Sequence, residues 1–572
     1  MKEMYFNRLT ILSKTAKKAA QFDFSKSYNL ILSKQKNSVG KSSLVKNIFW
    51  CFGCEPQFDD NWKSLDCRVI LDFEVKGKRY QIARHGKRFI LKNHEGKYKV
   101  YTATGGDFSV EIMALFEFDA LLAVRDKDEL VTPPPAYYFL PFYIDQKQSW
   151  ANAWSSFNNL GQFPSWKKTV IPYHTGMIGK EYFDKTKEIC SKKIEMADTN
   201  KEIDRFDTAI SVVSEFSANS GIVIEEVELD EIEKEISIDV MDLHFQQEIL
   251  FEELANLRAE QAHVESQIVI AKQSLEDVVA DYEFAECLDE DIECPTCGVV
   301  HDNSIVNRFS LFQDRNQAEE IIRRFQSDLA HLEEDILAKD SAFKSVREKI
   351  DQLDEKYSSE KDSNRSLSSV LDAISSKSVR KKVEANRSLK IESLHQLDVD
   401  EKLLVKERTN ASKESRKIVK EAFQEYFPRY LSKLKAFGVN TSSIKSPENH
   451  AKVAESGGAA ESTRAMLAYY ISVYNLIHKF GNHVLCPLVI DTPNQHEQAA
   501  KHYESIVSLL IDELPEQSQL FVCGMDSQKL ERLKAKAKTI YLDVEHSLLN
   551  TEEFEKIDFE YSGIFEQEES GV

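Results

Sequence analysis

The spacing of hydrophobic residues changes twice along the chain and divides it into three parts. Up to residue 178, short apolar runs alternate with turn residues, as in strands and short helices. Over 179–430, apolar residues recur every three or four positions between charged ones, as in long helices. Over 431–550 the globular pattern returns, and 551–572 is an acidic tail.

The middle part contains two heptad seams, which run from Leu243 to Val278 and from Ala318 to Leu353. The break between them contains a Cys-Pro dipeptide, and its proline disfavours a continuous helix. Two seams of similar length around one break fold most simply as an antiparallel coiled coil with arms of about 75 Å. We therefore expect an ascending arm over 179–290, a tip over 291–303 and a descending arm over 304–430. The alternative is two segments that dimerise separately.

Two further patterns refine this picture. The Ser-rich stretch from Ser358 to Ser378 predicts a break or elbow in the descending arm. In the N-terminal part, Tyr28–Leu32 reads as a buried strand. The alternation over 68–99 predicts hairpins that turn at Gly77 and Gly86.

A candidate phosphate-binding loop, SKQKNSVGKSSL, follows the buried strand and leads into an apolar helix. Lys41 is expected to reach the β and γ phosphates of a nucleotide, and the Ser42 hydroxyl to bind Mg²⁺. The remaining expected contacts come from Asn37, Gly40 and Ser43. The loop lacks two glycines, because Gln35 and Ser38 stand in their places. The alternative is an ordinary strand–turn–helix.

The C-terminal part contains three features in sequence. A Ser456-Gly457-Gly458 turn opens a helix, the apolar strand of CPLVIDTPNQ ends in Asp491, and QLFVCGMD forms a further apolar strand. A carboxylate at a strand end is suited to organising Mg²⁺.

In this order the features resemble the SMC and DNA-repair zinc-hook branch of the ABC-type ATPases over essentially the whole chain. The resemblance implies an α/β ABC-type ATPase head split between N- and C-terminal lobes, joined by a long antiparallel coiled coil with an apical zinc hook. Two heads would sandwich ATP, with Ser456, Gly457 and Gly458 reaching the γ-phosphate bound by the partner molecule. Gln146, or alternatively Gln148, matches the residue that touches Mg²⁺ and the attacking water, and Asp491 matches the Walker-B aspartate.

Two positions depart from the family pattern. The glutamate that normally acts as general base is Thr492 here, and no histidine lies in the strand that ends at Asp526. Loss of a general base lowers a rate by about 10²–10⁴. We therefore expect slow ATP hydrolysis, with Glu497 or His496 as alternative bases.

The break between the arms reads ECPTCGVVH, in which Cys294 and Cys297 have the spacing of two zinc ligands. One such pair supplies half of a tetrahedral site, so two chains are expected to share Zn²⁺ tip to tip. The alternatives are a redox dithiol or a site completed by Cys287 or His301. A second such pair, Cys51 and Cys54, has no partner pair and is expected to pack in the core.

The formal charge of −21 excludes a uniformly basic nucleic-acid coat. The segment 76–99 nevertheless carries nine Lys or Arg against one Glu, which favours contact with the DNA backbone. The candidates are Lys76, Lys78, Arg79, Arg84, Lys87 and Arg88. The alternative is a solvated edge hairpin whose lysines prevent aggregation. A weaker basic cluster surrounds Arg387, and the acidic tail reads as a docking or solvating segment.

With no apolar run of 18 residues and no signal pattern, the expectation is a cytoplasmic protein without a membrane partner. No nuclease motif is evident, and the compact build with its DTPNQ strand end most closely resembles the SMC-like subunit of Lamassu-type bacterial defence systems. That resemblance implies an ATPase homodimer that senses foreign double-stranded DNA and controls a nuclease effector in anti-phage and anti-plasmid defence, with a small helical accessory subunit. The alternatives are a DNA-repair or chromosome-maintenance ATPase, and an ATP-binding coiled-coil scaffold with little turnover.

Overall fold

The computed structural model describes residues 2–566 except for several short segments. These are 35–38, 126–128, 220–237, 287–290, 294–299, 303–304, 358–366, 455–458, 494–499 and 543–547. The chain divides into two compact units. The head unit comprises Met1–Ser191 and Lys402–Val572, and the arm unit comprises Lys192–Glu401.

The head unit contains a five-stranded parallel sheet built from both ends of the chain. Its strands, in spatial order, are β10 (Tyr143–Ile144), β13 (Leu488–Asp491), β14 (Leu520–Met525), β3 (Tyr28–Ser33) and β15 (Ala537–Tyr541). Val522 of β14 pairs with Ile490 of β13 on one side and with Leu30 of β3 on the other. The predicted strand at Tyr28–Leu32 is thereby confirmed, and the N- and C-terminal segments complete one sheet.

A second, antiparallel sheet comes from the N-terminal part alone. Its spatial order is β2 (Lys18–Asp23), β1 (Met4–Ser13), β4 (Arg68–Val75), β5 (Lys78–His85), β6 (Arg88–Lys92) and β7 (Tyr98–Tyr101). Gly77 and Gly86 adopt positive φ angles of 77° and 57° at the turns on either side of β5. Both predicted hairpin turns are confirmed.

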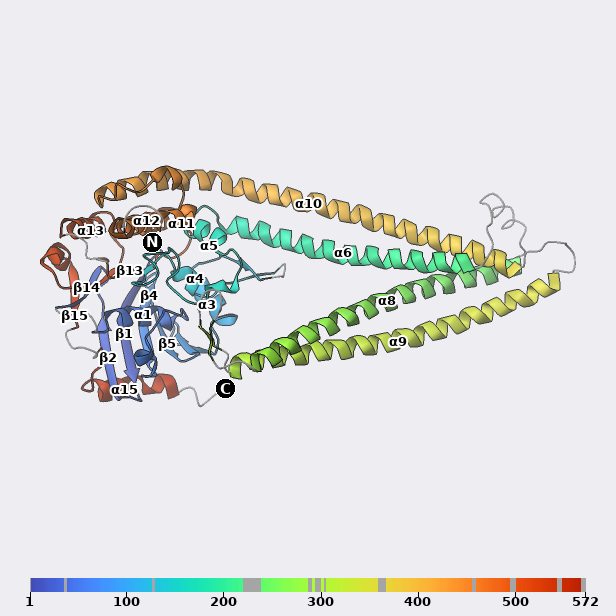
Figure 1. Cartoon of the computed structure of the whole chain (residues 1–572), viewed down its shortest axis with the longest axis horizontal. Coiled ribbons are helices and arrows are strands. Elements are labelled where there is room, and N and C mark those ends of the chain that lie inside the picture. The colour runs from blue at the N-terminus through green and yellow to red at the C-terminus, as the bar shows by residue number, and fades with distance from the viewer. Residues whose placement is uncertain are drawn as a thin grey trace. The chain divides into compact units, whose positions relative to one another are not determined.

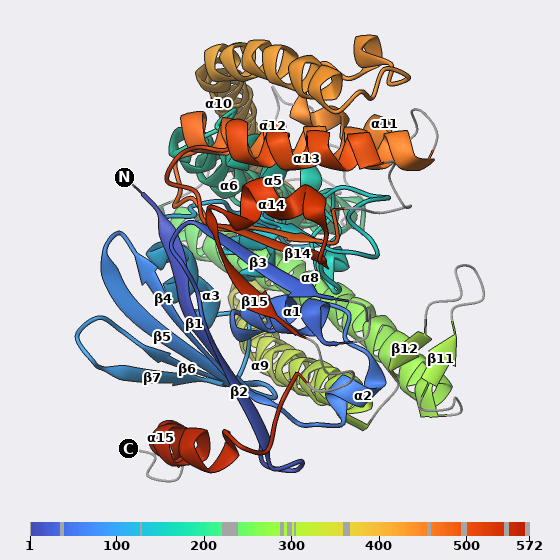
Figure 2. The same ribbon diagram turned by 90° about the vertical axis from the view of Figure 1, so that its left-hand side faces the viewer.

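Helix α1 (Lys41–Cys51) lies between the two sheets, as Figure 2 shows. Its residues Leu44, Val45, Ile48 and Phe49 are fully buried, because this spacing places apolar side chains toward both sheets. Helices α12 (Ala459–Phe480) and α13 (Ala500–Asp512) cover the other face of the parallel sheet. The parallel strands are therefore covered on both faces, which explains their continuous apolar runs.

The acidic tail is partly structured. Residues Phe554–Glu566 form helix α15, which packs on the antiparallel sheet (Figure 2). Ile557, Tyr561 and Phe565 are buried there, at a spacing of four residues that marks one helix face. The interpretation of the tail as a solvating segment is thus wrong for this helix, and partner docking stays a prediction.

The arm unit is built from four long helices (Figure 1). They are α6 (Lys180–Asn219), α8 (Ile238–Glu286), α9 (Ile305–Tyr357) and α10 (Leu367–Lys433), of which α6 and α10 extend into the head unit. Contacts show that α8 and α9 run antiparallel: the rings of Phe251 and Phe343 lie 6.1 Å apart, and Arg258 pairs with Asp340 at 3.7 Å. The two predicted seams therefore face each other.

Helices α6 and α10 form a second antiparallel pair, and the two pairs meet within the arm unit. Asp207 bonds Arg387 at 2.6 Å, and Glu202 bonds Lys390 at 2.6 Å. Where the pairs meet, buried apolar residues from all four helices pack together; they include Val213, Phe251, Phe343 and Val379. A single straight hairpin would not bring these four helices together.

A buried polar contact accompanies this junction. Gln247 of α8 donates to Asp372 of α10 over 2.5 Å, and Arg347 of α9 pairs with the other carboxylate oxygen at 2.9 Å. Part of the predicted elbow at 358–378 lies outside the described residues, and α10 begins at Leu367.

The predicted zinc ligands Cys294 and Cys297 lie outside the described residues. The flanking strands β11 (Asp291–Glu293) and β12 (Val300–Asp302) pair antiparallel. Within the described ranges, no group of three or more His, Cys, Asp or Glu could hold a metal ion. In the same ranges, no helix is both long and apolar enough to span a membrane.

Candidate nucleotide-binding site

Four of the predicted site residues meet at one edge of the parallel sheet. Strands β3, β13 and β10 are parallel, so their carboxyl ends lie on the same edge. Lys41 and Ser42 begin α1 after β3, Asp491 ends β13, and Gln146 follows β10. Asn37, Ser456, Gly457 and Gly458 lie outside the described residues and remain predictions.

The start of α1 has the geometry that a phosphate requires. Gly40 caps the helix with φ of 91°, a conformation that residues with a side chain rarely adopt. Lys41 is buried, and its Nζ donates to Ser33 Oγ over 2.6 Å at the end of β3. Burial lowers the pKa of Lys41. A negatively charged phosphate at this helix terminus would stabilise the ammonium group and accept backbone N–H bonds.

Next to this terminus, the oxygen ligands suit Mg²⁺. Asp491 is fully buried, and none of the described residues makes a hydrogen bond to its Oδ2. Burial raises the pKa of Asp491 to about 6, and the nearby Ser42 hydroxyl partly offsets that effect. The Ser42 hydroxyl donates to Gln146 Oε1 over 3.4 Å. Carboxylate, hydroxyl and amide oxygens are hard ligands, and a bound cation would satisfy the buried Oδ2.

The loop that carries Gln146 is organised by its neighbour, Asp145. This buried carboxylate accepts the backbone N–H groups of Lys147 at 2.9 Å and Gln148 at 3.1 Å, and the Tyr143 hydroxyl at 3.2 Å. Lys46 of α1 lies 4.0 Å from it. Between the two candidate glutamines, Gln146 is the one beside Ser42.

The position of the missing general base carries a strained residue. Thr492 has φ of 60°, which is rare for a β-branched residue. Its hydroxyl donates to Asp491 Oδ1 over 3.2 Å, and its N–H bonds the carbonyl of Cys523 in the neighbouring strand. The alternative bases His496 and Glu497 lie outside the described residues.

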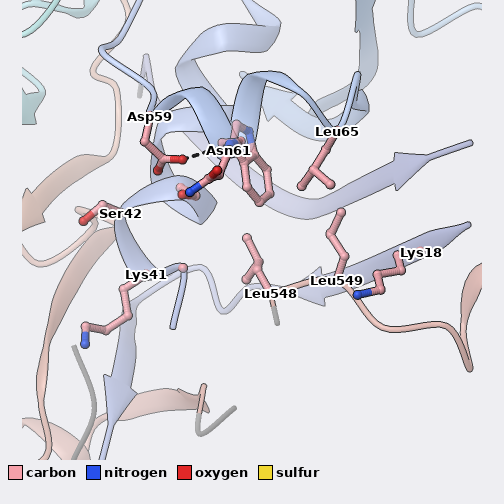
Figure 3. A pocket seen from close by; sticks show the side chains of 11 residues that line it. Lys18, Lys41, Ser42, Asp59, Asn61, Leu65, Leu548 and Leu549 are labelled. Atoms are coloured by element: carbon pink, nitrogen blue, oxygen red, sulfur yellow. Dashed lines mark hydrogen bonds between the residues drawn. The ribbon is translucent and has the colours of Figure 1, made fainter. Parts of the chain in front are cut away.

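A cavity of about 410 Å³ extends from the start of α1 to an apolar end (Figure 3). Gly40–Ser43 line one part, and Trp62, Leu65, Leu548 and Leu549 line the other. Its volume falls within the range of small-molecule sites. No sequence motif indicated that residues after the last strand of the sheet would reach the cavity.

The basic residues predicted to bind DNA do not form one patch. Lys76, Lys78 and Arg79 lie at one end of β5, and Lys87 and Arg88 lie at the other, about 25 Å away along the strand. Lys76 pairs with Glu117.

Arg84, also predicted to bind DNA, is a structural residue instead. It is 5% exposed, its guanidinium bonds Glu55 at 2.5 Å and the Trp50 carbonyl at 2.8 Å, and it lies over the Trp50 ring. A buried and satisfied guanidinium has no face left for a phosphate, so this assignment is corrected. The prediction that Cys51 and Cys54 pack in the core is confirmed, because both are buried free thiols.

A basic groove on the head unit was missed by sequence reasoning. This neck groove, of about 710 Å³, lies between α6 and α10 where both belong to the head unit. Its lining includes Arg408, Lys413, Arg416, Lys417 and Lys420, against one acidic residue, Glu421. The spacing of positions 413, 416, 417 and 420 marks one helix face and could have indicated it.

No protein-family model matches the chain. Lamassu protein LmuB of Bacillus cereus (strain VD014) is 24% identical over 553 residues, which cover 92% of this chain and 91% of that protein. Lamassu protein LmuB of Bacillus sp. (strain NCIM 5461) is 22% identical over 573 residues, covering 96% and 98%. A solved Smc head domain with a coiled coil and joint from Pyrococcus yayanosii is 14% identical and covers 98% of this chain and 100% of its own, with a TM-score of 0.41. The two relatives confirm the resemblance stated from the motifs: over more than nine-tenths of its length, the chain is similar to proteins of the Lamassu type.

Proposed function

We propose that the protein is an SMC-like, ATP-dependent DNA-sensing ATPase that controls a nuclease effector in anti-phage and anti-plasmid defence. The observation that carries this proposal is the convergence of Lys41, Ser42, Gln146 and Asp491 at one sheet edge. The similarity to two proteins named Lamassu protein LmuB supports the defence role.

In this proposal the head binds ATP with Mg²⁺. Lys41 and the N–H groups at the start of α1 bind the phosphates, while Ser42, Gln146 and Asp491 hold the cation, which neutralises phosphate charge when bound. Gln146 orients the attacking water. Thr492 stands where the family has the glutamate that accepts the proton of that water, and its hydroxyl already donates to Asp491, so hydrolysis is slow.

We propose that double-stranded DNA binds the neck groove. Five basic side chains line it in a protein of net charge −21, and phosphate contacts need such a local concentration of positive charge. Tyr182 and Gln424 add polar groups that contact sugar or phosphate. The hairpin residues Lys78, Arg79 and Lys87 remain candidates because they are exposed. They are secondary to the neck groove because they are divided between the two ends of β5.

The proposed assembly is a homodimer. Two heads join through ATP and the signature residues Ser456, Gly457 and Gly458, and two tips join through Zn²⁺ held by Cys294 and Cys297 of each chain. A nuclease effector and a small helical accessory subunit complete the complex.

One alternative is favoured by a specific observation. Thr492 in place of a general base suits an ATP-binding scaffold that hardly turns over, whose DNA affinity would not depend on ATP.

The DNA site is tested by removing charge in matched pairs. Lys413→Ala with Lys417→Ala should weaken DNA binding and lower the slope of log K against log salt by about 1.8, because each lost phosphate contact contributes roughly 0.9. Lys536→Ala with Lys538→Ala removes the same charge from exposed positions elsewhere and should leave the slope unchanged. Equal slopes for both pairs would exclude the neck groove.

A further inference from the structure

The apolar end of the cavity is lined by a segment that belongs to no nucleotide motif. Residues Leu548–Asn550, here called the C-terminal strap, follow the last strand of the parallel sheet. Leu548 and Leu549 are 6% and 4% exposed and line the cavity beside Gly40 (Figure 3). A Cβ atom at Gly40 would lie 2.7 Å from Leu548 Cβ, so the strap is in contact with the phosphate-binding loop.

The strap is held firmly by its own backbone. Asn550 donates to the Ala19 carbonyl over 3.0 Å and accepts from the Ala19 N–H over 2.8 Å, at the edge strand β2. Helix α15 follows at once and is anchored on the antiparallel sheet through Ile557 and Tyr561. The position of the strap is therefore set by the sheet that also borders the cavity.

Residues from another part of the chain line the same cavity. Helix α2 (Asp60–Lys63) presents Trp62, and its N-cap Asp59 accepts the Trp62 N–H over 2.8 Å. Leu65 follows on the same side, and Lys18 and Asn61 supply the polar groups at the rim. The cavity is thus charged where it meets Lys41 and apolar where it meets the strap.

We propose that the C-terminal strap is the wall against which the base and ribose of the bound nucleotide pack, with Trp62 opposite. The proposal rests on the proposed nucleotide site. With the phosphates at the start of α1, the nucleoside must extend into space continuous with it, and the 410 Å³ cavity provides such space. A flat, largely apolar heterocycle fits between an indole and two leucines, because stacking and burial of apolar surface both favour it.

This arrangement gives the C-terminal residues a role in selecting the ligand. In this arrangement the start of α1 recognises the phosphates of the ligand, whereas the strap contacts its base and ribose. Because α15 directly follows the strap in the chain, the arrangement also links the packing of α15 on the antiparallel sheet to the binding of a nucleotide.

The test compares ATP with inorganic tripolyphosphate, which has the phosphates but no base. In the full-length protein with Mg²⁺, Leu548→Ala with Leu549→Ala should weaken ATP binding about tenfold and change tripolyphosphate binding less than twofold, as measured by calorimetry. Trp62→Ala, on the opposite wall, should likewise weaken ATP binding and leave tripolyphosphate binding nearly unchanged. This second variant provides the test if the leucine variant folds poorly. Phe559→Ala, an exposed residue of α15, is the matched control and should change neither affinity.

Equal weakening of both ligands would overturn the proposal, since the strap would then only support the phosphate-binding loop. Unchanged ATP affinity in both wall variants would also overturn it. If the wild-type protein bound neither ligand, the proposed nucleotide site itself would be wrong, and the inference would fall with it. If the wild-type protein bound tripolyphosphate as tightly as ATP, the base would add nothing to the affinity. That result would reject the inference about the strap and leave the proposed phosphate site standing.

Discussion

Thr492 donates its hydroxyl hydrogen to Oδ1 of Asp491 over 3.2 Å, from a backbone with φ of 60°. This bond occupies one oxygen of the carboxylate and leaves the buried Oδ2 for a cation. A β-branched residue in this conformation costs about 1–3 kcal/mol, and such strain concentrates at functional sites. The geometry thus leaves room for a cation beside Asp491, in agreement with the proposed Mg²⁺-ATP site.

Replacing Thr492 tests whether the missing carboxylate makes turnover slow, as proposed. Thr492→Glu supplies the missing carboxylate and should raise the rate of phosphate release at least tenfold, within the ~10²–10⁴ available to a general base. Thr492→Gly relieves the strain without supplying a base, so it should stabilise the fold by about 1 kcal/mol in thermal unfolding and leave the rate unchanged. If the glutamate variant were no faster, another residue already acts as the base.

Asp145 is expected to act as a positioning residue for Gln146. Asp145→Ala releases the N–H groups of Lys147 and Gln148, so Gln146 loses its place beside Ser42. The rate of phosphate release should fall tenfold or more with little change in KM. Asp23→Asn, on the exposed edge strand, serves as control. A rise in KM alone would contradict this role.

Substitution of Arg84 shows whether this arginine stabilises the fold or contacts DNA. Arg84→Ala removes a buried guanidinium, one of two donors to the Trp50 carbonyl and the hydrogen-bond partner of Glu55, which should destabilise the head by about 2–3 kcal/mol. At a temperature where the variant stays folded, the salt dependence of DNA binding should be unchanged. A lower salt slope would restore Arg84 to the DNA-binding set.

A histidine pair links the two lobes of the head and predicts acid sensitivity. His174 Nδ1 lies 2.9 Å from His483 Nε2, and both rings are buried. Burial lowers the pKa of His483 to about 4 and that of His174 in the same direction.

Below about pH 6.5 these histidines bind protons in the unfolded chain but not in the folded head. The free energy of unfolding is therefore highest above that pH and falls as the pH drops toward 4. His483 alone accounts for about 3 kcal/mol of that loss. Urea unfolding at pH 7.5, 6 and 5 measures it. The double variant His174→Gln, His483→Gln should flatten the dependence, and an undiminished slope would assign it to other groups.

Much of the head could be predicted from local patterns. The strand before Lys41, the strand ending in Asp491 and the turns at Gly77 and Gly86 each depend on short-range signals: apolar runs, glycine and charge. The packing of the α6–α10 pair against the α8–α9 pair could not be predicted. The heptad seams specify which helices pair with each other, but not where a second pair of helices packs against the first. Arg84 was misassigned because charge in a sequence does not reveal burial.

The site was predicted only as far as its motifs extend. Lys41 and Ser42 follow the spacing of a phosphate-binding loop, and Gln146 and Asp491 were matched through the family resemblance, so their convergence was expected. Leu548 and Leu549 obey no such rule, since two leucines are ordinary core residues until the fold brings them against Gly40. The neck groove depends on two helices that are more than two hundred residues apart in sequence.

The central claim is that ATP controls DNA binding, and one measurement tests it most directly. The affinity of the purified full-length protein for a double-stranded oligonucleotide is measured at fixed salt with and without Mg²⁺-ATP, beside Lys41→Ala. The account predicts that ATP tightens DNA binding at least tenfold in the wild type and not at all in the variant. Equal affinity with and without ATP in the wild type would contradict it and favour the scaffold.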